Sequence, residues 1–372
     1  MNLITYKVSN NNHHVTFCKK NSLNKISHSL IKINTDKNIL FIYDNKVQKK
    51  LVEELYSELK LSGCNIVKFK CEGFKKNKNE KLLFKILDLL LRKKFTKSSI
   101  IISFGGGVVG DVSALASSLY LRGMNYYCIP TTMTSIVDSS IGGKTAINYK
   151  GIINTIGTYY HPKNVFILEQ VIETLPDREF FAGISEIIKC GIIDNNQILN
   201  FLRKNRKKIF DRDISNIFKI CSYTLKAKIK FFQNDIYEKN KRLNLNFGHT
   251  FAHAIEMALD KQNNDYIRHG EAVGLGILCE LFYANKKKNK IFKETQELLK
   301  SYNLPIQLNF EKIPYNLSKI QNEIYKNVFL DKKKLDKNPR YICVRKKGKP
   351  EIKEVENYDF INDTIHKVLF GK

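Results

Sequence analysis

The sequence predicts an α/β domain built on a parallel sheet, followed by an all-α domain. Short β-rich runs alternate with amphipathic helical patterns in the first half, and one strand runs directly into a glycine-rich turn. After ETLPDREF (173–180), long helical periods replace the strands. Pro176 suits a helix start, so we expect domains at 1–175 and 176–372.

The elements of the first half follow in chain order. Amphipathic helices are expected at 49–63, which Gly63 closes, and at 80–95. Strands are expected at NILFIYD (38–44), NIVKFKC (65–71), SSIIISFGGG (98–107), YYCIPTT (126–132) and NVFILE (164–169). In the second half, the helical periods cover 180–193, 195–232, 249–260, 270–287 and 293–302.

Composition limits the class of protein. No apolar run approaches the roughly 20 residues that cross a membrane, and the first residues lack the apolar core of a signal peptide. We therefore expect a soluble, cytoplasmic protein with no membrane partner. The net charge of +27 would suit nucleic acid, but the lysines are dispersed and no nucleic-acid-binding motif is visible, so we expect no such partner. The 8 cysteines form no C-x-x-C pair, which indicates reduced packing residues.

Two glycine-rich segments are candidates for phosphate binding. GGGVVGDVSALASSLYLRG (105–123) follows a strand and opens a helix that we expect to begin near Asp111, where free N–H groups would face an anion. It lacks the G-x-G-x-x-G spacing of dinucleotide sites. PTTMTSIVDSSIGGKTAIN (130–148) fails as a P-loop, because Asp138 stands where the first glycine belongs. Lys144 is either an anion ligand or a solvated lysine in a tight turn.

The segment LNLNFGHTFAHAIE (243–256) places two histidines four residues apart, on one face of an expected helix. The zinc-protease pattern H-E-x-x-H is not met, because Thr250 stands where its glutamate belongs. His249 and His253 are therefore either core histidines or parts of a metal site.

Two other segments place polar groups on apolar helices. Glu186 and Lys189 lie one turn apart, and His269 stands at a helix entrance. One carboxylate and two imidazoles suit a divalent ion such as Zn²⁺ with positions left open for substrate, so Glu186, His249 and His269 form a candidate metal set. His253 would then orient a ligand or transfer a proton.

Six motifs resemble, in order, those of the 3-dehydroquinate synthase family: GGGVVGD, PTTMTSIVDSSIGGKTAIN, TLPDRE, SEIIKCGII, LNFGHTFAHAIE and HGEAVGLG. The resemblance implies a Rossmann-like NAD-binding domain, a helical metal- and substrate-binding domain, and an active site in the cleft between them. It implies conversion of 3-deoxy-D-arabino-heptulosonate 7-phosphate to 3-dehydroquinate and phosphate, a step of the shikimate pathway to chorismate and the aromatic amino acids. The steps would be transient oxidation, phosphate elimination, reduction, ring opening and aldol closure. The implied cofactors are NAD and zinc, cobalt or another divalent metal.

The resemblance also assigns residues. It places the metal on Glu186, His249 and His269. Its catalytic positions are Lys144, Lys189, Lys226, Arg242, Asn246 and His253. Its cofactor-binding positions are Asp44, Lys78, Gly106, Gly107, Val108, Gly110, Asp111, Thr131, Thr132, Lys144, Thr174 and Glu179. Its substrate-binding positions are Arg122, Asp138, Asn154, and Lys332 or Lys333. Arg122 would reach the substrate phosphate of a neighbouring subunit, which implies a homodimer.

Two positions depart from the family pattern. Lys75 stands where the family has a cofactor-binding glutamate, and Ile153 where it has a cofactor-binding lysine, which implies weaker or rearranged NAD binding. Four alternatives stay open. They are a related sugar-phosphate cyclase, an inactive synthase, a metal-dependent polyol dehydrogenase that accumulates NADH, and a nucleic-acid-binding protein that leaves the metal set unexplained.

Overall fold

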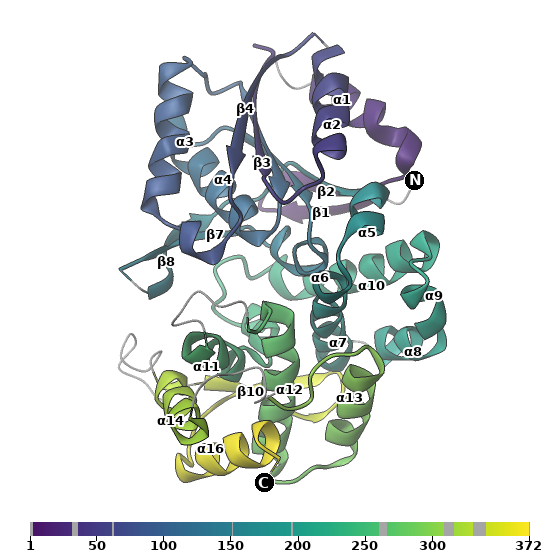
Figure 1. Ribbon diagram of the computed structural model, residues 1–372, viewed down its shortest axis with the longest axis vertical. Coiled ribbons are helices and arrows are strands. Elements are labelled where there is room, and N and C mark those ends of the chain that lie inside the picture. Colours follow the sequence, from purple (N-terminus) through teal and green to yellow (C-terminus); the bar gives the residue numbers. More distant parts are fainter. Residues whose placement is uncertain are drawn as a thin grey trace. The chain divides into compact units, whose positions relative to one another are not determined.

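The computed structural model describes residues 3–31, 36–61, 63–150, 152–194, 196–259, 266–308, 316–329 and 340–371. The chain divides into two compact units, Met1–Pro176 (unit 1) and Asp177–Lys372 (unit 2) (Figure 1). Every helix within the described ranges is too short or too polar to cross a bilayer.

The described part of unit 1 is built on a seven-stranded sheet with the order β1-β2-β9-β6-β5-β3-β4. Its strands are β1 (Leu3–Val8), β2 (Asn11–Cys18), β3 (Asn38–Asp44), β4 (Asn65–Cys71), β5 (Ile100–Gly105), β6 (Asn125–Pro130) and β9 (Asn164–Leu168). From β2 to β4 the neighbours pair in parallel, whereas β1 joins β2 antiparallel at one edge. The predicted parallel sheet is confirmed. The edge hairpin was not predicted, because β1 alternates buried and exposed residues over only six positions.

Helices cover this sheet because its central strands are apolar on both faces. In β5, Ile100, Ile102 and Phe104 belong to a core that also contains residues of α1 (Leu23–Ile31) and α2 (Lys49–Leu61). The alternate residue Ile101 is equally buried on the other side. The remaining helices of the unit are α3 (Glu80–Arg92), α4 (Gly107–Leu119) and α5 (Glu169–Thr174). A separate antiparallel hairpin joins β7 (Lys144–Tyr149) to β8 (Ile152–Tyr159).

Unit 2 is largely helical, as predicted, and is organised around one buried helix. In helix α12 (His269–Asn285), Gly270 and every residue from Ala272 to Ala284 are buried. The helices around it include α7 (Ile184–Ile193), α11 (His249–Leu259) and α13 (Lys290–Ser301) (Figure 1). The other α-helices in the described part of this unit are α6 (Asp177–Ala182), α8 (Asn196–Lys204), α9 (Arg206–Phe210), α10 (Ile214–Phe232), α14 (Leu317–Val328) and α16 (Asp359–Thr364).

Two details of unit 2 differ from the sequence prediction. The helical period 195–232 is divided into α8, α9 and α10. Helix α10 starts anew because the Asp213 side chain accepts a hydrogen bond from the Asn216 N–H. The unit also contains an antiparallel hairpin of β10 (Arg340–Lys346) and β11 (Lys349–Glu354), so it is not all-α.

Candidate metal centre and nucleotide pocket

Three helices of unit 2 bring the predicted metal ligands together. Glu186 on α7, His249 at the start of α11 and His269 at the start of α12 each offer a ligand atom, and these atoms lie within 4.8 Å of one another. The Oε1 atom of Glu186 lies 3.7 Å from Nε2 of His249 and 3.4 Å from Nε2 of His269. Ligands of a tetrahedral Zn²⁺ at about 2.0–2.1 Å are about 3.3 Å apart. The three side chains therefore fit one divalent ion.

Each imidazole is oriented through its other nitrogen. Nδ1 of His249 donates to the carbonyl of Phe247 at 3.2 Å, and Nδ1 of His269 lies 3.0 Å from Oε2 of Glu256. A proton held at Nδ1 leaves the Nε2 lone pair for a metal. His253 lies beside both rings, with its ring centroid 5.4 Å from that of His249 and 6.3 Å from that of His269.

The electrostatics of the cluster are strong because it is buried. Lys189 is 1% exposed, and its Nζ lies 2.6 Å from Oε2 of Glu186, so the two oxygens of that carboxylate face different partners. Burial and then the Lys189 charge lower the pKa of His249 to about 3. Burial would also lower the pKa of His269, but the adjacent Glu256 and Glu186 carboxylates raise it to about 10. The cluster thus concentrates negative charge on the His269 side.

Local sequence explains why the two histidines start their helices at this place. Gly248 precedes α11 with a φ of +83°, and a Cβ there would lie 2.7 Å from Cγ1 of Ile277, so glycine is required. At the start of α12, the Glu271 carboxylate accepts from the Arg268 N–H at 2.8 Å. Glu271 in turn binds Arg178 through two bonds of 2.7 Å. These charged contacts fix the N-terminus of α12, the helix that carries His269.

A tight turn before α11 carries three more polar groups. The Asp235 carboxylate accepts from the N–H groups of Lys239, Asn240 and Arg242, which lowers its pKa although burial would raise it. Within this turn Glu238 has a φ of +56°, and its Oε1 accepts from Nδ2 of Asn246 at 3.0 Å. Left-handed backbone at a non-glycine residue often marks a functional site. Glu238 was not predicted, since only the folded turn shows its contact with Asn246.

The turn also buries Arg242, which is 2% exposed and donates to the carbonyl of Ile236 at 2.7 Å. On α10, Lys226 is exposed. Lys228 instead lies four residues after Thr224 and seven after Cys221, on the buried face, and is 6% exposed. Helical periodicity alone could have identified Lys228 as the enclosed lysine.

Glu179, Lys332 and Lys333 are the remaining predicted residues of unit 2. Oε1 of Glu179 on α6 lies 2.6 Å from Nε of Arg268, so this carboxylate joins the ion pairs at the start of α12. Lys332 and Lys333 lie outside the described residues.

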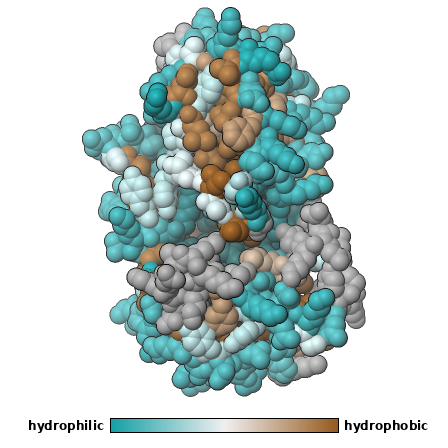
Figure 2. Space-filling model, turned by 90° about the vertical axis from the view of Figure 1, so that its left-hand side faces the viewer, coloured by the Kyte–Doolittle hydropathy of each residue, from teal (hydrophilic) through white to brown (hydrophobic). Residues whose placement is uncertain are grey.

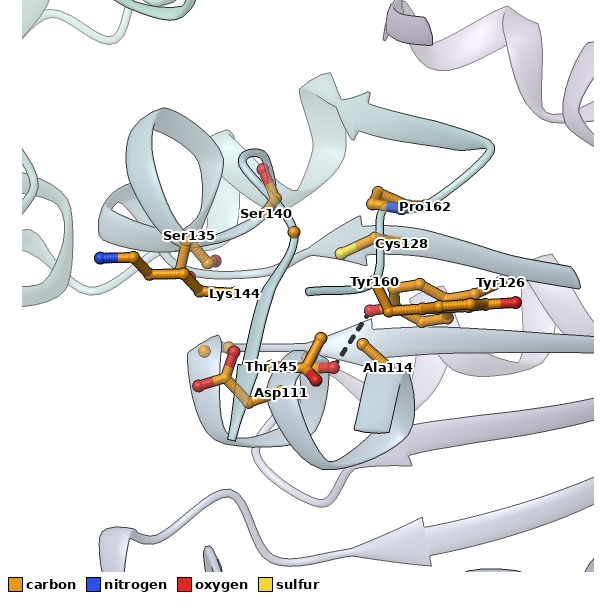
Figure 3. Close-up of a pocket in the computed structure, with 16 residues that line it drawn as sticks. Asp111, Ala114, Tyr126, Cys128, Ser135, Ser140, Lys144, Thr145, Tyr160 and Pro162 are labelled. Atoms are coloured by element: carbon orange, nitrogen blue, oxygen red, sulfur yellow. Dashed lines mark hydrogen bonds between the residues drawn. The ribbon is translucent and has the colours of Figure 1, made fainter. Parts of the chain in front are cut away.

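Unit 1 contains a pocket at the glycine-rich turn (Figure 3). Its wall includes Gly106, Gly107, Gly110, Asp111 and Lys144 among the predicted residues. The structure adds residues that were not among the predicted site residues: Tyr126, Cys128, Ser135, Ser139, Ser140 and Tyr160. Helix α4 begins at Gly107, not near Asp111 as predicted, so the glycines themselves form its first turn and present its free N–H groups.

Ion pairing links three predicted residues beside this pocket. Nζ of Lys78 lies 2.5 Å from Oδ2 of Asp111 and donates to Oδ1 of Asn154 at 2.5 Å. The backbone N–H of Asn148 donates to the carbonyl of Lys78, which ties the β7–β8 hairpin to this lysine. Gly143 has a φ of +69° and precedes the exposed Lys144. A Cβ at Gly143 would clash with the ring of His161.

The other predicted residues of unit 1 surround the same strand ends. Asp44 ends β3 and accepts from the N–H groups of Lys46 and Gly73. The N–H of Thr131 donates to the carbonyl of Gly105, and Thr132 lies against Gly106. Asp44, Thr131 and Thr132, like Lys78 and Asn154, are not part of the pocket wall. The same holds for Val108 on α4, Arg122 in a turn after α4, Asp138 in a short helical turn, and Thr174, whose hydroxyl donates to the carbonyl of Gln170.

Comparison with known proteins decides the family. The model of the 3-dehydroquinate synthase N-terminal region matches residues 68–182, and the model of the 3-dehydroquinate synthase C-terminal region matches residues 183–334. The chain belongs to the 3-dehydroquinate synthase family. It is therefore an enzyme of this family, as the motifs predicted. A 3-dehydroquinate synthase from Prochlorococcus marinus subsp. pastoris is 34% identical over 371 residues, covering 98% of this chain and 97% of that relative.

Solved structures share the fold of this synthase-family chain. A 2-epi-5-epi-valiolone synthase from Streptomyces hygroscopicus subsp. jinggangensis, with NAD⁺ and Zn²⁺ bound, matches with a TM-score of 0.83 at 20% identity over 96% of each chain. A 2-deoxy-scyllo-inosose synthase complexed with carbaglucose-6-phosphate, NAD⁺ and Co²⁺ matches with a TM-score of 0.82 at 21% identity, covering 99% of this chain and 100% of that one. At these identities the likeness concerns the fold, and the bound groups are those of the relatives.

Proposed function

We propose that this chain is a 3-dehydroquinate synthase, which converts 3-deoxy-D-arabino-heptulosonate 7-phosphate to 3-dehydroquinate and phosphate. The observation that carries the proposal is the cluster of Glu186, His249 and His269 in a chain whose full-length relatives bear that name. The donor set suits Zn²⁺, Co²⁺ or another divalent ion. When bound, the metal would polarise a substrate oxygen and NAD would accept and return a hydride.

The residues of unit 2 would hold the sugar ring and move its protons. His253 stands beside both candidate metal ligands, so it is suited to take a proton from a substrate hydroxyl. Lys189 presents a buried positive charge next to Glu186, which favours negative charge developing on a substrate oxygen. Lys228, in place of Lys226, together with Arg242 and Asn246, would position further oxygens of the substrate.

The residues of unit 1 would bind the cofactor and an anion. The first turn of α4 offers N–H groups to the pyrophosphate of NAD, and the Lys78–Asp111 pair fixes the side chains beside it. Lys144 and Asn154 would hold the substrate phosphate. Phosphate held there can itself take the proton when it leaves, so the protein mainly has to orient it. Ile153 and Lys75 stand at the two positions that depart from the family pattern, and they would lower the affinity for NAD.

We also propose that the protein is a homodimer formed through unit 1. Leu121 and Arg122 have φ angles of 49° and 62°, a strained conformation that places an exposed arginine at the surface. Large apolar side chains are exposed close to Arg122 in the sequence, at Leu119 and Leu121. Others are exposed on the β7–β8 hairpin, at Ile152, Ile153 and Ile156. Figure 2 shows apolar surface gathered on one face of unit 1. A second copy covering such a surface would bring its own Arg122 to the neighbouring phosphate site. Light scattering after size exclusion tests this: a monomer at micromolar concentration would contradict it.

The catalytic proposal is tested by phosphate release. The purified chain is incubated with the heptulosonate phosphate, with and without added Zn²⁺ and NAD⁺. Release that needs both, without net accumulation of NADH, is expected of a synthase. Accumulating NADH would indicate a dehydrogenase, and release only from other sugar phosphates would indicate a related cyclase. His249→Ala should lose zinc and activity together, and a variant that keeps both would refute the ligand assignment. Absence of release from every substrate would indicate an inactive synthase.

A further inference from the structure

Three carboxylates are buried among the described residues of unit 2, and two of them, Glu256 and Glu280, have no role in the predicted site. Glu186 belongs to the metal set. Glu280 accepts a hydrogen bond from the N–H of Ile342 at 3.1 Å, which ties α12 to β10. Glu256 is 6% exposed, near the end of α11. A buried carboxylate is costly unless it is paired, so the partner of Glu256 indicates what it does.

The partner of Glu256 is a metal ligand on another helix. Glu256 follows His253 by three residues and His249 by seven, so the three side chains share one face of α11. Oε2 of Glu256 lies 3.0 Å from Nδ1 of His269 at the start of α12. Helix α11 therefore provides one candidate metal ligand, His249. About two turns later it also provides Glu256, the carboxylate that contacts the second candidate ligand, His269.

The contact decides which nitrogen of His269 can bind a metal. A carboxylate only accepts hydrogen bonds, so it requires the proton of the neutral ring to be on Nδ1. The lone pair is then on Nε2, which faces Oε1 of Glu186 at 3.4 Å. His269 is also 32% exposed at its side chain, so without a partner its ring would be freer to turn than that of His249, at 13%. For His249 the same role belongs to a backbone carbonyl, which substitution does not remove.

We infer that Glu256 is a positioning residue for the divalent metal, acting through His269. It fixes the orientation and tautomer of that imidazole and makes Nε2 a stronger ligand. The inference rests on the proposed metal-dependent function. A merely structural role, in which the pair only ties α11 to α12, predicts lower stability with unchanged metal affinity.

The test measures Zn²⁺ affinity of the metal-free, full-length protein by competition with a chromophoric chelator at constant pH. Glu256→Ala removes the acceptor, and we expect affinity about 10–100-fold weaker. Glu256→Gln keeps an oxygen acceptor but loses the charge, so we expect an intermediate loss of about 3–10-fold. Glu294→Gln is the matched control, because this carboxylate lies on α13 and pairs with Lys347 and Arg203. It should bind Zn²⁺ within about twofold of the unsubstituted chain.

A second readout is the visible spectrum of the Co²⁺-loaded protein, which reports the ligand geometry. We expect an altered band for Glu256→Ala and a band close to that of the unsubstituted chain for Glu256→Gln. Circular dichroism establishes that each variant is folded. If Glu256→Ala does not fold, Glu256→Gln decides by its affinity.

The outcomes separate the inference from the function on which it rests. If the unsubstituted chain binds one Zn²⁺ that His249→Ala loses, but the folded Glu256 variants bind it equally well, the inference is overturned and the metal site stands. If neither the unsubstituted chain nor Glu294→Gln binds Zn²⁺, both are overturned. Graded loss from Gln to Ala, with normal binding by the control, supports the inference.

Discussion

Gly276 is the position where the packing of unit 2 most directly controls the metal centre, and replacing it by alanine is our principal prediction. A Cβ at this position of α12 would lie 2.0 Å from the carbonyl oxygen of Gly248 and 2.9 Å from the N–H nitrogen of Ala252. Both atoms are backbone, so neither can rotate away. Because ordinary contact begins at 3.4 Å, the first turn of α11 has to move by about 1.4 Å.

The magnitude follows from two opposing effects. Alanine in a helix interior is favoured over glycine by about 1 kcal/mol, whereas overpacking a close helix contact costs about 1–3 kcal/mol or more. Because the clash is with backbone at 2.0 Å, the cost belongs at the upper end of this range, and we expect a net loss of about 2 kcal/mol of unfolding free energy. His249 starts the displaced turn, and metal–ligand distances tolerate only about 0.2 Å. A displacement of this size should lower the rate of phosphate release by about 100-fold.

Gly274→Ala is the matched control on the same helix. Its Cβ would lie 3.0 Å from Oγ of Ser185 and 3.1 Å from Cδ2 of Leu299, which are ends of side chains that can give by a few tenths of an ångström. Urea denaturation and Zn²⁺ titration of both variants provide the measurement. If Gly276→Ala is as stable as Gly274→Ala and binds Zn²⁺ as well, the reasoning from helix contact to metal site is refuted.

Three further predictions concern charge and the nucleotide pocket. Burial raises the pKa of Glu280 from 4.5 to about 8, so its contribution to stability is full below pH 4.5 and is lost as pH rises toward 8. We therefore compare the unfolding free energy of Glu280→Gln with that of the unsubstituted chain. The difference, variant minus unsubstituted, should increase between pH 5 and 8 by up to about 1.4 kcal/mol per pH unit. A difference that does not change with pH would contradict this. Lys78→Met removes the cation paired with Asp111. NAD⁺ affinity measured by calorimetry should then fall about 10-fold or more. A change of less than about twofold would count against a role of this ion pair in NAD⁺ binding. Ile153→Lys should tighten NAD⁺ binding, and unchanged affinity would show that this departure is harmless.

Residue type and spacing were sufficient to predict which three residues form the candidate metal cluster. Glu186, His249 and His269 were predicted because a carboxylate and two imidazoles on apolar helices are unusual unless they bind something. Their convergence depends on the contacts of α7 and α11 with α12, and the sequence shows these contacts only indirectly, through glycines such as Gly276.

Sequence motifs did not predict contacts between side chains that are distant in the sequence. Glu256 and His269 are 13 residues apart on different helices, and Glu238 contacts Asn246 only through the turn that Asp235 organises. Lys228 is different, because its place on the buried face of α10 follows from helical spacing. The parallel sheet was predictable from the apolar runs of its strands, whereas β1 and β11, each one strand of an unpredicted hairpin, lack such a run.

Anomalous scattering at the zinc edge, from crystals of the zinc-loaded protein, tests the central claim most directly. We predict one strong peak in unit 2, at about 2.0–2.2 Å from a carboxylate oxygen of Glu186 and from Nε2 of both His249 and His269. Zinc bound at any other place, with these three side chains outside its coordination sphere, would contradict the account.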